Sequence, residues 1–452
     1  MKQVLALLFT VLTLPSLAQQ NYYGIQGSQR KGIQAAIMNP ADLNNLYRPV
    51  ELHFFSSQFA LSNNTLSFRD FTNSEDAYFL EGFRNSERPF NGRTVGSILG
   101  PSLGLNFGKF ALGFSTEFKA AAHFINVDPG LGRYLLENSF ESSFSSLSLN
   151  SSNNQRVNQV NWMELGLMAA YTLFENERQK LSAGTNIKFL LPGNYTNISI
   201  DQFIGSIVQE SSVISLTGAR SDIELSYNES ILDEGLFNFN LNNSIFSNPV
   251  SVGFDLGLSY QIKNQMQRTL FNSGLTVRNL GNLNFGNGQI TRTYGMNIPE
   301  NTSFRLDELP ADFQQIETLF IESALFTNTS EKSVNRLSLP TVIAFNADMA
   351  LIKNLQLSFY GQKAFGNSEN NSQVPVQEFY AIIPRLVLGN FEIYSPWTLF
   401  DFSGFNGGIG LRYGGFFVGS YSALTSFTLD TKQADFHLGF SWGFGKKERD
   451  SN

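Results

Sequence analysis

The 452-residue sequence contains no cysteine, few charged residues and no long apolar run beyond its first residues. Without cysteine the chain has no disulfide, no thiol nucleophile and no cysteine-ligated zinc site. Charged residues make up 15% of the chain, against about 25% in typical soluble domains. No later stretch approaches the ~20 continuous apolar residues of a membrane-spanning helix, which excludes a helical membrane protein. The net charge of −7 argues against a nucleic-acid partner.

The N-terminus has the three parts of a secretory signal peptide. Lys2 supplies the positive charge, residues 4–14 form an apolar stretch, and Ser16 and Ala18 are small residues at a cleavage site before Gln19. The apolar stretch is too short to span a bilayer of about 30 Å. We therefore expect residues 1–18 to be removed on export, and no cysteine follows them to carry a lipid anchor.

Phenylalanine and glycine are abundant, with 43 and 38 residues, and apolar residues tend to alternate with small or polar ones. Residues 434–444 show this most clearly. The apolar positions are Ala434, Phe436, Leu438, Phe440, Trp442 and Phe444. Because alternate residues of a strand point to opposite faces, this segment has one apolar face and one nearly bare face.

The same alternation recurs along most of the chain. Expected strands, some of them paired as hairpins, cover residues 51–61, 102–118, 163–173, 181–189, 252–262, 271–277, 343–349, 355–359 and most of 376–444. Turns are expected at residues 108–109, 353–354, 389–390 and 414–415. The count of strands is about fourteen, and their length fits tilted crossings of a bilayer. The sequence predicts an all-β fold, a transmembrane antiparallel β-barrel over residues 50–445 followed by a charged tail at residues 446–452.

Charged residues within these strands fall on the inward face. They are Glu164, Lys188, Asp255, Asp348 and Arg412. A charge on the lipid face would cost roughly 2–4 kcal/mol at the bilayer midplane, so we expect this set to line the lumen. It could form a selective lining or polar gate, or only a hydrated, salt-bridged interior, and we favour the second interpretation. Trp162, Trp397 and Trp442 are candidates for aromatic girdles.

Long insertions alternate with the short turns, as they do between the two rims of a barrel. The expected loops cover residues 65–95, 126–158, 201–248 and 282–337. The second loop contains a candidate short helix at residues 131–140 and a Ser/Asn-rich stretch at 142–154. The third contains a candidate strand around 213–225. In the fourth, Pro310 precedes helical spacing of apolar residues across 311–325.

Residues 32–43 contain the sequence Asn39-Pro40-Ala41 shortly after the signal peptide. This resembles the Asn-Pro-Ala motif of FadL-like outer-membrane barrels, including the PorV-like proteins of Bacteroidota. The resemblance implies fourteen strands, a plug-like segment at residues 19–49 in or across the lumen, and plug or rim positions for Asn39, Pro40 and Ala41. Residues 404–420 are also similar to the end of an uncharacterised Bacteroidota barrel family.

The last expected strand carries a second resemblance. His437, Gly439, Trp442 and Phe444 resemble the signal by which the barrel-assembly machinery recognises a final strand. This implies that machinery as a partner. The chain departs from the common pattern because a charged tail follows Phe444.

No catalytic or cofactor site is indicated. The three histidines, His53, His123 and His437, are far apart in the sequence, and neither a nucleophile elbow nor a phosphate-binding loop is present. We expect no metal and no cofactor. An enzyme, such as a barrel phospholipase, would need a facing Ser/His pair that the sequence does not predict.

Two functions remain open, both in the outer membrane of a Gram-negative bacterium and in contact with its lipid. One is passive transport of a small hydrophobic solute, as the resemblance to FadL-like barrels implies. The other is a barrel that docks partner proteins in envelope biogenesis or protein secretion, as PorV-like proteins do.

Overall fold

A computed structural model describes residues 22–445, apart from residues 29, 69–85, 87, 132–143, 211–212, 230–247, 267, 287, 311–312, 333–334 and 367–369. The expected signal peptide and charged tail lie outside the described residues, as does nearly all of the helix expected at residues 131–140.

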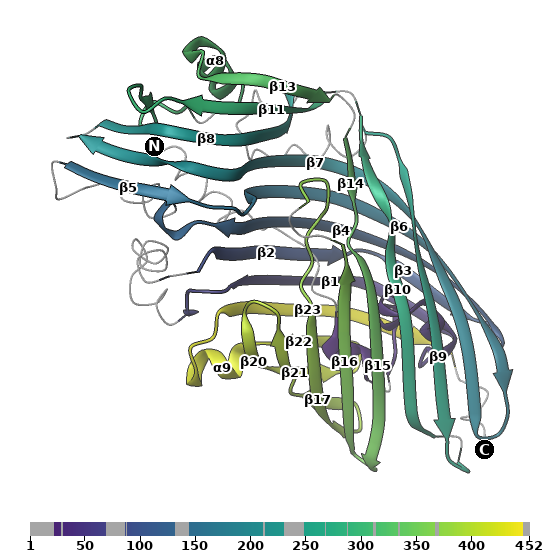
Figure 1. Cartoon of the computed structure of the whole chain (residues 1–452). Helices are drawn as coiled ribbons and strands as arrows, with labels where there is room; N and C mark the ends of the chain where they lie inside the picture. Colours follow the sequence, from purple (N-terminus) through teal and green to yellow (C-terminus); the bar gives the residue numbers. More distant parts are fainter. Residues whose placement is uncertain are drawn as a thin grey trace.

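Fourteen antiparallel strands form a closed ring (Figure 1). In chain order they are β1 (Val50–Asn63), β2 with β3 (Phe90–Leu99 and Ser102–Asn106), β4 (Phe110–Val127), β6 (Gln155–Glu175), β7 (Gln179–Glu210), β9 (Ser251–Lys263), β10 (Thr269–Phe285), β15 (Thr341–Ile352), β16 (Leu355–Phe365), β17 (Phe379–Leu388), β18 with β19 (Phe391–Tyr394 and Trp397–Phe400), β20 with β21 (Gly404–Gly407 and Ile409–Tyr413), β22 (Phe416–Ser420) and β23 (Gln433–Phe444). Pairing of β1 with β23 closes the ring. The predicted transmembrane barrel of about fourteen strands is confirmed.

The outward face of the ring is apolar. In β9 the exposed positions are Val252, Phe254, Leu256 and Leu258, each between 44% and 51% exposed, while the residues between them are buried. The alternation of exposed apolar and buried positions continues on β10, β15 and β17, although the buried positions of β15 and β17 include apolar residues such as Val342, Phe379 and Ile383. The outer belt has the pattern of a barrel wall that faces lipid.

None of the described helices has both the length and the apolar character needed to cross a membrane.

The wall continues beyond the ring as an extension of the same sheet, which we call the outer sheet. β7 is 32 residues long. Its first part pairs with β9 in the ring, and residues 197–210 pair with β8 (Val213–Asn228). The other members of the outer sheet are β5 (Phe144–Asn150), β11 (Gln289–Ile298), β12 (Phe304–Arg305) and β13 (Phe326–Lys332). A short strand, β14 (Asn335–Ser338), pairs with the end of β10.

Helix α8 (Phe313–Ser323) covers one face of the outer sheet (Figure 1). Its buried residues, Phe313, Glu317 and Phe320, have helical spacing, so they share one face. Phe313 stacks on Tyr227 of β8 at 5.1 Å between ring centroids. Phe320 stacks on Phe326 of β13 at 3.9 Å. The outer sheet therefore has a hydrophobic core of its own.

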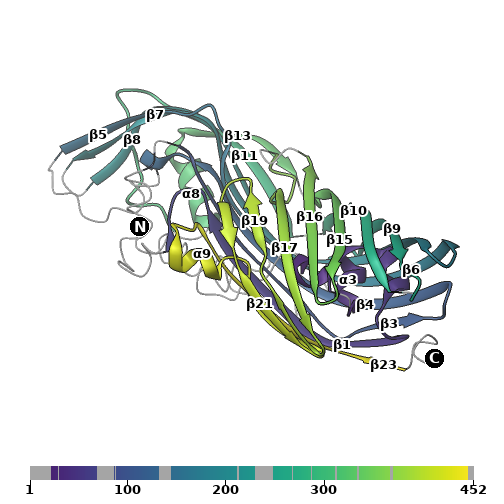
Figure 2. The ribbon, with the colours of Figure 1, turned by 90° about the horizontal axis from the view of Figure 1, so that it is seen from below.

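A segment of the N-terminus fills part of the ring. It comprises α2 (Tyr23–Gln26), α3 (Ile33–Met38) and the 3₁₀ helix η1 (Pro40–Asn45). We call residues 22–46 the lumenal segment. Figure 2 shows α3 enclosed between β15 and β16 on one side and β3 and β4 on the other. The last described helix, α9 (Ala423–Thr428), lies between β22 and β23 in the chain.

Four predictions of local structure are wrong. The loop expected at residues 282–337 contains the end of β10 and the strands β11, β12 and β13, and most of β14. The loop expected at residues 65–95 ends earlier, because β2 begins at Phe90. The loop expected at 126–158 contains β5 and the start of β6 at Gln155. β5 is rich in serine, so it has no clear alternation that could have revealed a strand. The mainly stranded run expected at 376–444 contains α9.

Trp162 is not part of an aromatic girdle. It is fully buried inside the ring, and its Nε1 donates a hydrogen bond to Glu164 Oε1 at 2.8 Å. The even-numbered positions of β6 are buried on both sides of the bulge between Val160 and Trp162, so Trp162 belongs to the inward face. Trp397 and Trp442, in contrast, are exposed on the outside.

Candidate functional site

The sequence Asn39-Pro40-Ala41 lies directly against the wall of β7, β9 and β10. Asn39 Oδ1 accepts a hydrogen bond from the Ala41 backbone N–H at 3.1 Å and caps η1, with Pro40 at the first helical position. Asn39 Nδ2 donates to the carbonyl of Leu258 on β9 at 2.9 Å. The Asn39 side chain thus caps a helix of the lumenal segment and also binds that segment to β9.

Three glycines on neighbouring strands make room for this motif. A Cβ at Gly184 of β7 would lie 2.4 Å from the Pro40 carbonyl carbon. A Cβ at Gly257 of β9 would lie 2.1 Å from Asn39 Oδ1, and one at Gly274 of β10 would lie 2.4 Å from Asn39 Nδ2. Since real Cβ atoms do not approach so closely, any side chain at these positions would push the segment away.

Asp42 anchors the segment further along. Its carboxylate is fully buried, accepts from Lys31 Nζ at 2.9 Å and from Ser259 Oγ at 3.1 Å, and also accepts from Asn45 Nδ2. Lys31 Nζ also lies 3.8 Å from Asp348 of β15. Asp348, predicted to face the lumen, is therefore placed against the lumenal segment.

A second group of charges holds the N-terminal half of the segment. Ser28 Oγ lies 2.8 Å from both carboxylate oxygens of Glu392, to which it donates. Arg385 pairs with the same carboxylate at 3.1 Å and also donates to the Gly24 carbonyl. Arg412 donates to Ser28 Oγ at 3.2 Å. We call Ser28, Glu392, Arg385 and Arg412 the Glu392 clasp.

Glu164, Lys188 and Asp255 form a third group on three adjacent strands. Lys188 Nζ lies 3.2 Å from Glu164 Oε2 and 2.8 Å from Asp255 Oδ2. Lys119 of β4 joins it and pairs with Glu164 and Glu117 at 3.0 Å each. The structure thus brings together three of the five predicted lumenal charges. Asp348 and Arg412 lie in the other two groups.

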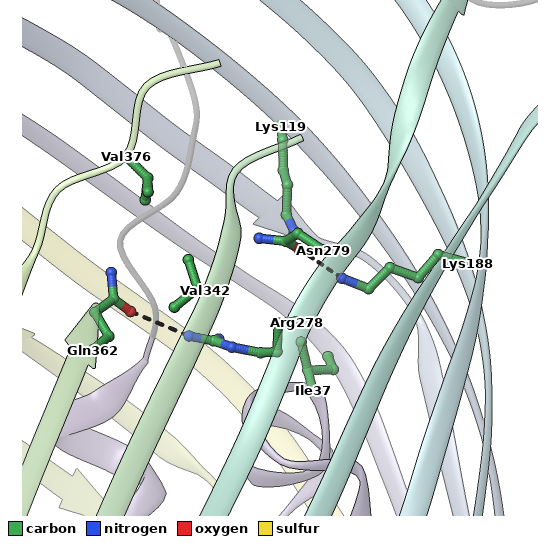
Figure 3. Close-up of a pocket in the computed structure, with 8 residues that line it drawn as sticks. All are labelled: Ile37, Lys119, Lys188, Arg278, Asn279, Val342, Gln362 and Val376. Carbon is green, nitrogen blue, oxygen red and sulfur yellow. Dashed lines mark hydrogen bonds between the residues drawn. The ribbon is translucent and has the colours of Figure 1, made fainter. Parts of the chain in front are cut away.

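A small cavity lies beside this third group (Figure 3). Ile37 of the lumenal segment forms one side, and Val342 and Val376 supply further apolar surface. The polar lining residues are Lys119, Lys188, Arg278, Asn279 and Gln362. Because they come from β4, β7, β10 and β16, the cavity lies within the lumen between separate parts of the ring.

A β-bulge on β10 aims two of these side chains into the cavity. Val277 pairs with Leu256 and Leu280 with Phe254, so Arg278 and Asn279 together oppose Asp255. Asn279 has φ of 61°, a conformation that asparagine tolerates better than most residues. Its backbone N–H, freed by the bulge, donates to Asp255 Oδ1 at 2.7 Å. Figure 3 shows both side chains at the cavity. Bulges of this kind often re-aim side chains next to functional sites.

Sequence reasoning missed Arg278, Lys119 and Glu392. Arg278 continues the inward phase of Asn272, Gly274 and Thr276, so the same alternation would have found it had the strand been extended by one residue. Lys119 lies one residue past the expected hairpin. Glu392 follows a turn that was predicted correctly at Gly389 and Asn390, but its short strand carried no separate prediction.

The residues of the expected assembly signal lie on both faces of β23. Trp442 and Phe444 are exposed on the outer face. His437 is buried, and its Nε2 lies 2.6 Å from the Tyr394 hydroxyl. Gly439 lies against Phe417 and Ser56, where a Cβ would meet Ser56 Cβ at 2.4 Å.

The histidines do not form a metal site. His53 contacts Gln34, His123 contacts Asn158 and His437 contacts Tyr394. Within the described part of the chain no group of three metal-ligating residues occurs.

The ring, its apolar outer belt and its occupied lumen define a transmembrane β-barrel. The chain belongs to a family of unknown function, DUF5723, whose model matches residues 49–420. No curated protein matches the sequence.

Solved structures similar to the chain include two toluene transporters and a FadL homologue. The toluene transporter TbuX of Ralstonia pickettii is 9% identical, with a TM-score of 0.44 over 92% of this chain and 95% of that chain. The toluene transporter TodX of Pseudomonas putida is 7% identical, with a TM-score of 0.45 over the same shares. A FadL homologue of Pseudomonas aeruginosa is 10% identical, with a TM-score of 0.33 over 96% of this chain and 99% of that chain.

Proposed function

We propose that the chain is a passive channel for a small hydrophobic solute in the outer membrane of a Gram-negative bacterium, with the lumenal segment as its plug. The observation that carries the proposal is the cavity against Ile37, inside a closed ring whose outer face is apolar. Ligand sites in barrels typically combine apolar surface with a few placed polar groups. Ile37, Val342 and Val376 beside the bulged residues of β10 fit that description.

Asn39, Pro40 and Ala41 act in this proposal as the fixed point of the plug. The three glycines and the hydrogen bond to Leu258 hold that point against β9, while the charged groups hold the two ends. The lumenal charges then support the walls, and the cavity is the part of the lumen open to a solute.

The test uses cells with an intact lipopolysaccharide leaflet, since that leaflet slows hydrophobic solutes. Cells that express the chain should take up radiolabelled benzyl alcohol, a small neutral aromatic solute, faster than cells with an empty vector. Val342→Trp, which fills the cavity, should remove the difference. Ile343→Trp adds the same side chain on the outer face of the same strand, where Ile343 is 37% exposed, and should leave uptake unchanged. Equal uptake with and without the chain would contradict the proposal.

Export and assembly follow from the same proposal. Residues 1–18 direct export, and the barrel-assembly machinery recognises His437, Gly439, Trp442 and Phe444 on the closing strand. Gly439→Leu should lower the amount of folded barrel, as measured by the heat-dependent shift in electrophoretic mobility. Gly439 packs against Ser56 and Phe417, so its replacement also disturbs packing inside the barrel. Trp442 lies on the outer face, so Trp442→Leu changes the signal without disturbing that packing and should also lower the amount of folded barrel.

A second function, docking of partner proteins in envelope biogenesis or secretion, is favoured by the outer sheet. That sheet has its own core, and β13 is paired on one side only among the described strands, with all its residues after Phe326 exposed. An exposed strand edge can add a strand from a partner. Crosslinking in cells followed by purification should then recover a partner at β13, and recovery of the barrel alone would exclude this role.

A further inference from the structure

A second segment of the chain enters the lumen. Residues 370–378 belong to the connection between β16 and β17, and we call them the strap. Val374 and Gln377 are buried, whereas Asn370 and Ser372 are exposed. The strap therefore has one face toward the lumen and one face toward solvent.

The strap reaches strands on the other side of the ring. Asn371 Nδ2 donates a hydrogen bond to Ser199 Oγ of β7 at 2.7 Å. Asn371 Oδ1 accepts from Nδ2 of Asn154, the residue before β6, at 2.8 Å. Gln377 Oε1 accepts from Arg93 Nη1 of β2 at 3.2 Å. A segment that leaves the wall between β16 and β17 is thus bound to β2, to β7 and to the start of β6.

Apolar packing joins the strap to the same part of the wall. Val374 belongs to a buried cluster that also contains Trp162 of β6, Leu190 of β7 and Leu283 of β10. Further members of the cluster come from β1, β2 and β4. The strap therefore packs on the part of the wall that runs from β1 to β10, while its own ends belong to β16 and β17.

The inner face of the strap rests on the lumenal segment. Val376 packs against the apolar cluster that contains Tyr22, Tyr23 and Met38 of that segment. It also lines the small cavity together with Ile37, and Figure 3 shows these two residues at different ends of the cavity. The lumen is thus filled by two segments that support each other, so removal of the lumenal segment would also free the strap.

The strap lies at the end of the barrel that faces the cell exterior. Short turns at residues 353–354, 389–390 and 414–415 lie at the opposite end, where Val50 of β1 pairs with Phe444 of β23. In bacterial barrels the short turns are periplasmic and the longer connections are external. Since β16 runs away from the turn at 353–354, the connection that follows it is external.

The strap is held by contacts that can break one at a time. Among the described residues it forms one β bridge, between Gln373 and Ser338, and its side chains otherwise make single hydrogen bonds, each of which contributes little. The lumenal segment, in contrast, is held by buried ion pairs such as that of Lys31 with Asp42. Segments that move during function come from the weakly held parts of a fold.

We infer that the strap is the outer gate of the solute path. It closes the lumen from the cell exterior, and release of Asn371 and Gln377 from the wall opens it. The inference rests on the proposed function, because it takes the lumen as the path of the solute. It adds a second closure, so a solute passes only when both the strap and the lumenal segment have moved.

The first experiment fixes the strap to the wall of the full chain. Because the chain has no cysteine, Asn371→Cys with Ser199→Cys creates a unique pair at side chains that contact each other in the parent. After cells react with a short bis-thiosulfonate crosslinker, benzyl alcohol uptake should fall to the empty-vector level, and dithiothreitol should restore it. Ser148→Cys with Ser206→Cys joins β5 to β7 in the outer sheet, and crosslinking there should leave uptake unchanged.

The second experiment follows release of the strap without a solute. In a Val374→Cys background, where residue 374 is buried, a water-soluble maleimide should react slowly. Adding Asn371→Ala removes two side-chain contacts of the strap and should raise the labelling rate severalfold. Asn297→Ala removes an exposed side-chain hydrogen bond in the outer sheet and should leave the rate unchanged.

Uptake that persists after crosslinking would overturn the inference, and so would slow labelling of residue 374 in the presence of Asn371→Ala. The labelling variants carry no cysteine pair, so they decide the matter if that pair does not fold. Equal uptake by cells with and without the parent chain would contradict the proposed function. Labelling needs no transported solute, so the two failures are distinguishable.

Discussion

Single glycines decide how closely the lumenal segment approaches the barrel wall. Gly184, Gly257 and Gly274 occupy inward positions where other strand residues carry polar side chains. Their role depends on the absence of a side chain, so the alternation of the sequence shows only that they face inward. The partner that needs the space, Asn39-Pro40-Ala41, lies far away in the chain and could be connected to them only by the structure.

Gly257→Ala should displace the lumenal segment. The added Cβ would lie 2.1 Å from Asn39 Oδ1, and overpacking of this kind costs about 1–3 kcal/mol. We expect a lower unfolding temperature and faster tryptic cleavage at Lys31, which is buried in the intact protein. Gly295→Ala of β11, where the nearest atom would be 3.5 Å away, is the matched control. Unchanged cleavage in Gly257→Ala would show that the segment does not depend on this contact.

A half-buried carboxyl in the outer sheet, that of Glu224, should make the stability of the sheet depend on pH. Burial raises the pKa of Glu224 above its usual value, although Asn371, Lys332 and Arg156 act in the opposite direction. The folded state therefore binds the proton more tightly than the unfolded state does. The resulting penalty is absent below the unfolded pKa of about 4.3 and grows as pH rises through the folded pKa.

Glu224→Gln should remove that penalty and stabilise the outer sheet at neutral pH, because the amide oxygen still accepts from Asn197 Nδ2. Hydrogen exchange of residues 213–228, corrected for the intrinsic rate at each pH, measures this. Exchange in the parent should slow as pH falls, and the variant should lose that trend. Asp222→Asn changes an exposed carboxyl on the same strand and is the control. A parent without pH dependence would show that Glu224 is not the responsible group.

Elements differ in how far the sequence revealed them. The helix predicted at residues 311–325 is observed at Phe313–Ser323, because Phe313 and Phe320 keep helical spacing. The first strand was predicted at 51–61 and is Val50–Asn63. β5 was missed because its serines do not alternate with apolar residues, so no strand pattern shows in the sequence. The long continuation of β7 into the outer sheet depends on its pairing with β8, which the sequence does not reveal.

The lumenal segment is attached at its N-terminal half through the Glu392 clasp, and breaking the clasp should release that half. Glu392 and Arg385 are both fully buried. Removal of one charge of a buried pair leaves the other uncompensated, at a cost of roughly 3–5 kcal/mol. Glu392→Gln should therefore loosen residues 22–28 while the contacts of Asn39 keep the rest of the segment in place.

The lack of cysteine makes this measurable, because a single introduced cysteine has a unique label. In an Ile25→Cys background, where residue 25 is buried, a water-soluble maleimide should react slowly. Adding Glu392→Gln should increase the rate severalfold. Glu331→Gln removes an exposed glutamate of the outer sheet and should have no effect. Slow labelling in both backgrounds would mean that the clasp does not hold the segment.

At the scale of the whole molecule, the closed ring follows from one repeated property, the two-residue period of apolar and polar positions. The predicted inward charges are all buried or half-buried in the ring, but their division into three groups depends on which strands are neighbours and on the lumenal segment between them. A barrel lumen brings together residues that are hundreds of positions apart, such as Ser28 and Glu392. The alternation in the sequence predicts whether a strand residue points inward or outward. Its contact partner inside the lumen is decided only when the ring closes.

Removal of the lumenal segment should open the barrel to ions. The segment fills the ring between β3–β4 and β15–β16, and most of its side chains are buried there (Figure 2). A fourteen-strand ring without the segment leaves a lumen wide enough for water to enter, as in larger barrels with aqueous channels. In planar bilayers the full mature chain should show little steady conductance, and a variant lacking residues 22–46 should show large, long-lived open states. Gly295→Ala, which leaves the segment intact, should behave like the parent.

The deleted variant must first show the heat-dependent mobility shift of a folded barrel, because the segment also contributes apolar contacts to the wall. A folded but non-conducting deletion variant would show that the strands and outer loops alone close the lumen, and that the segment is not the plug.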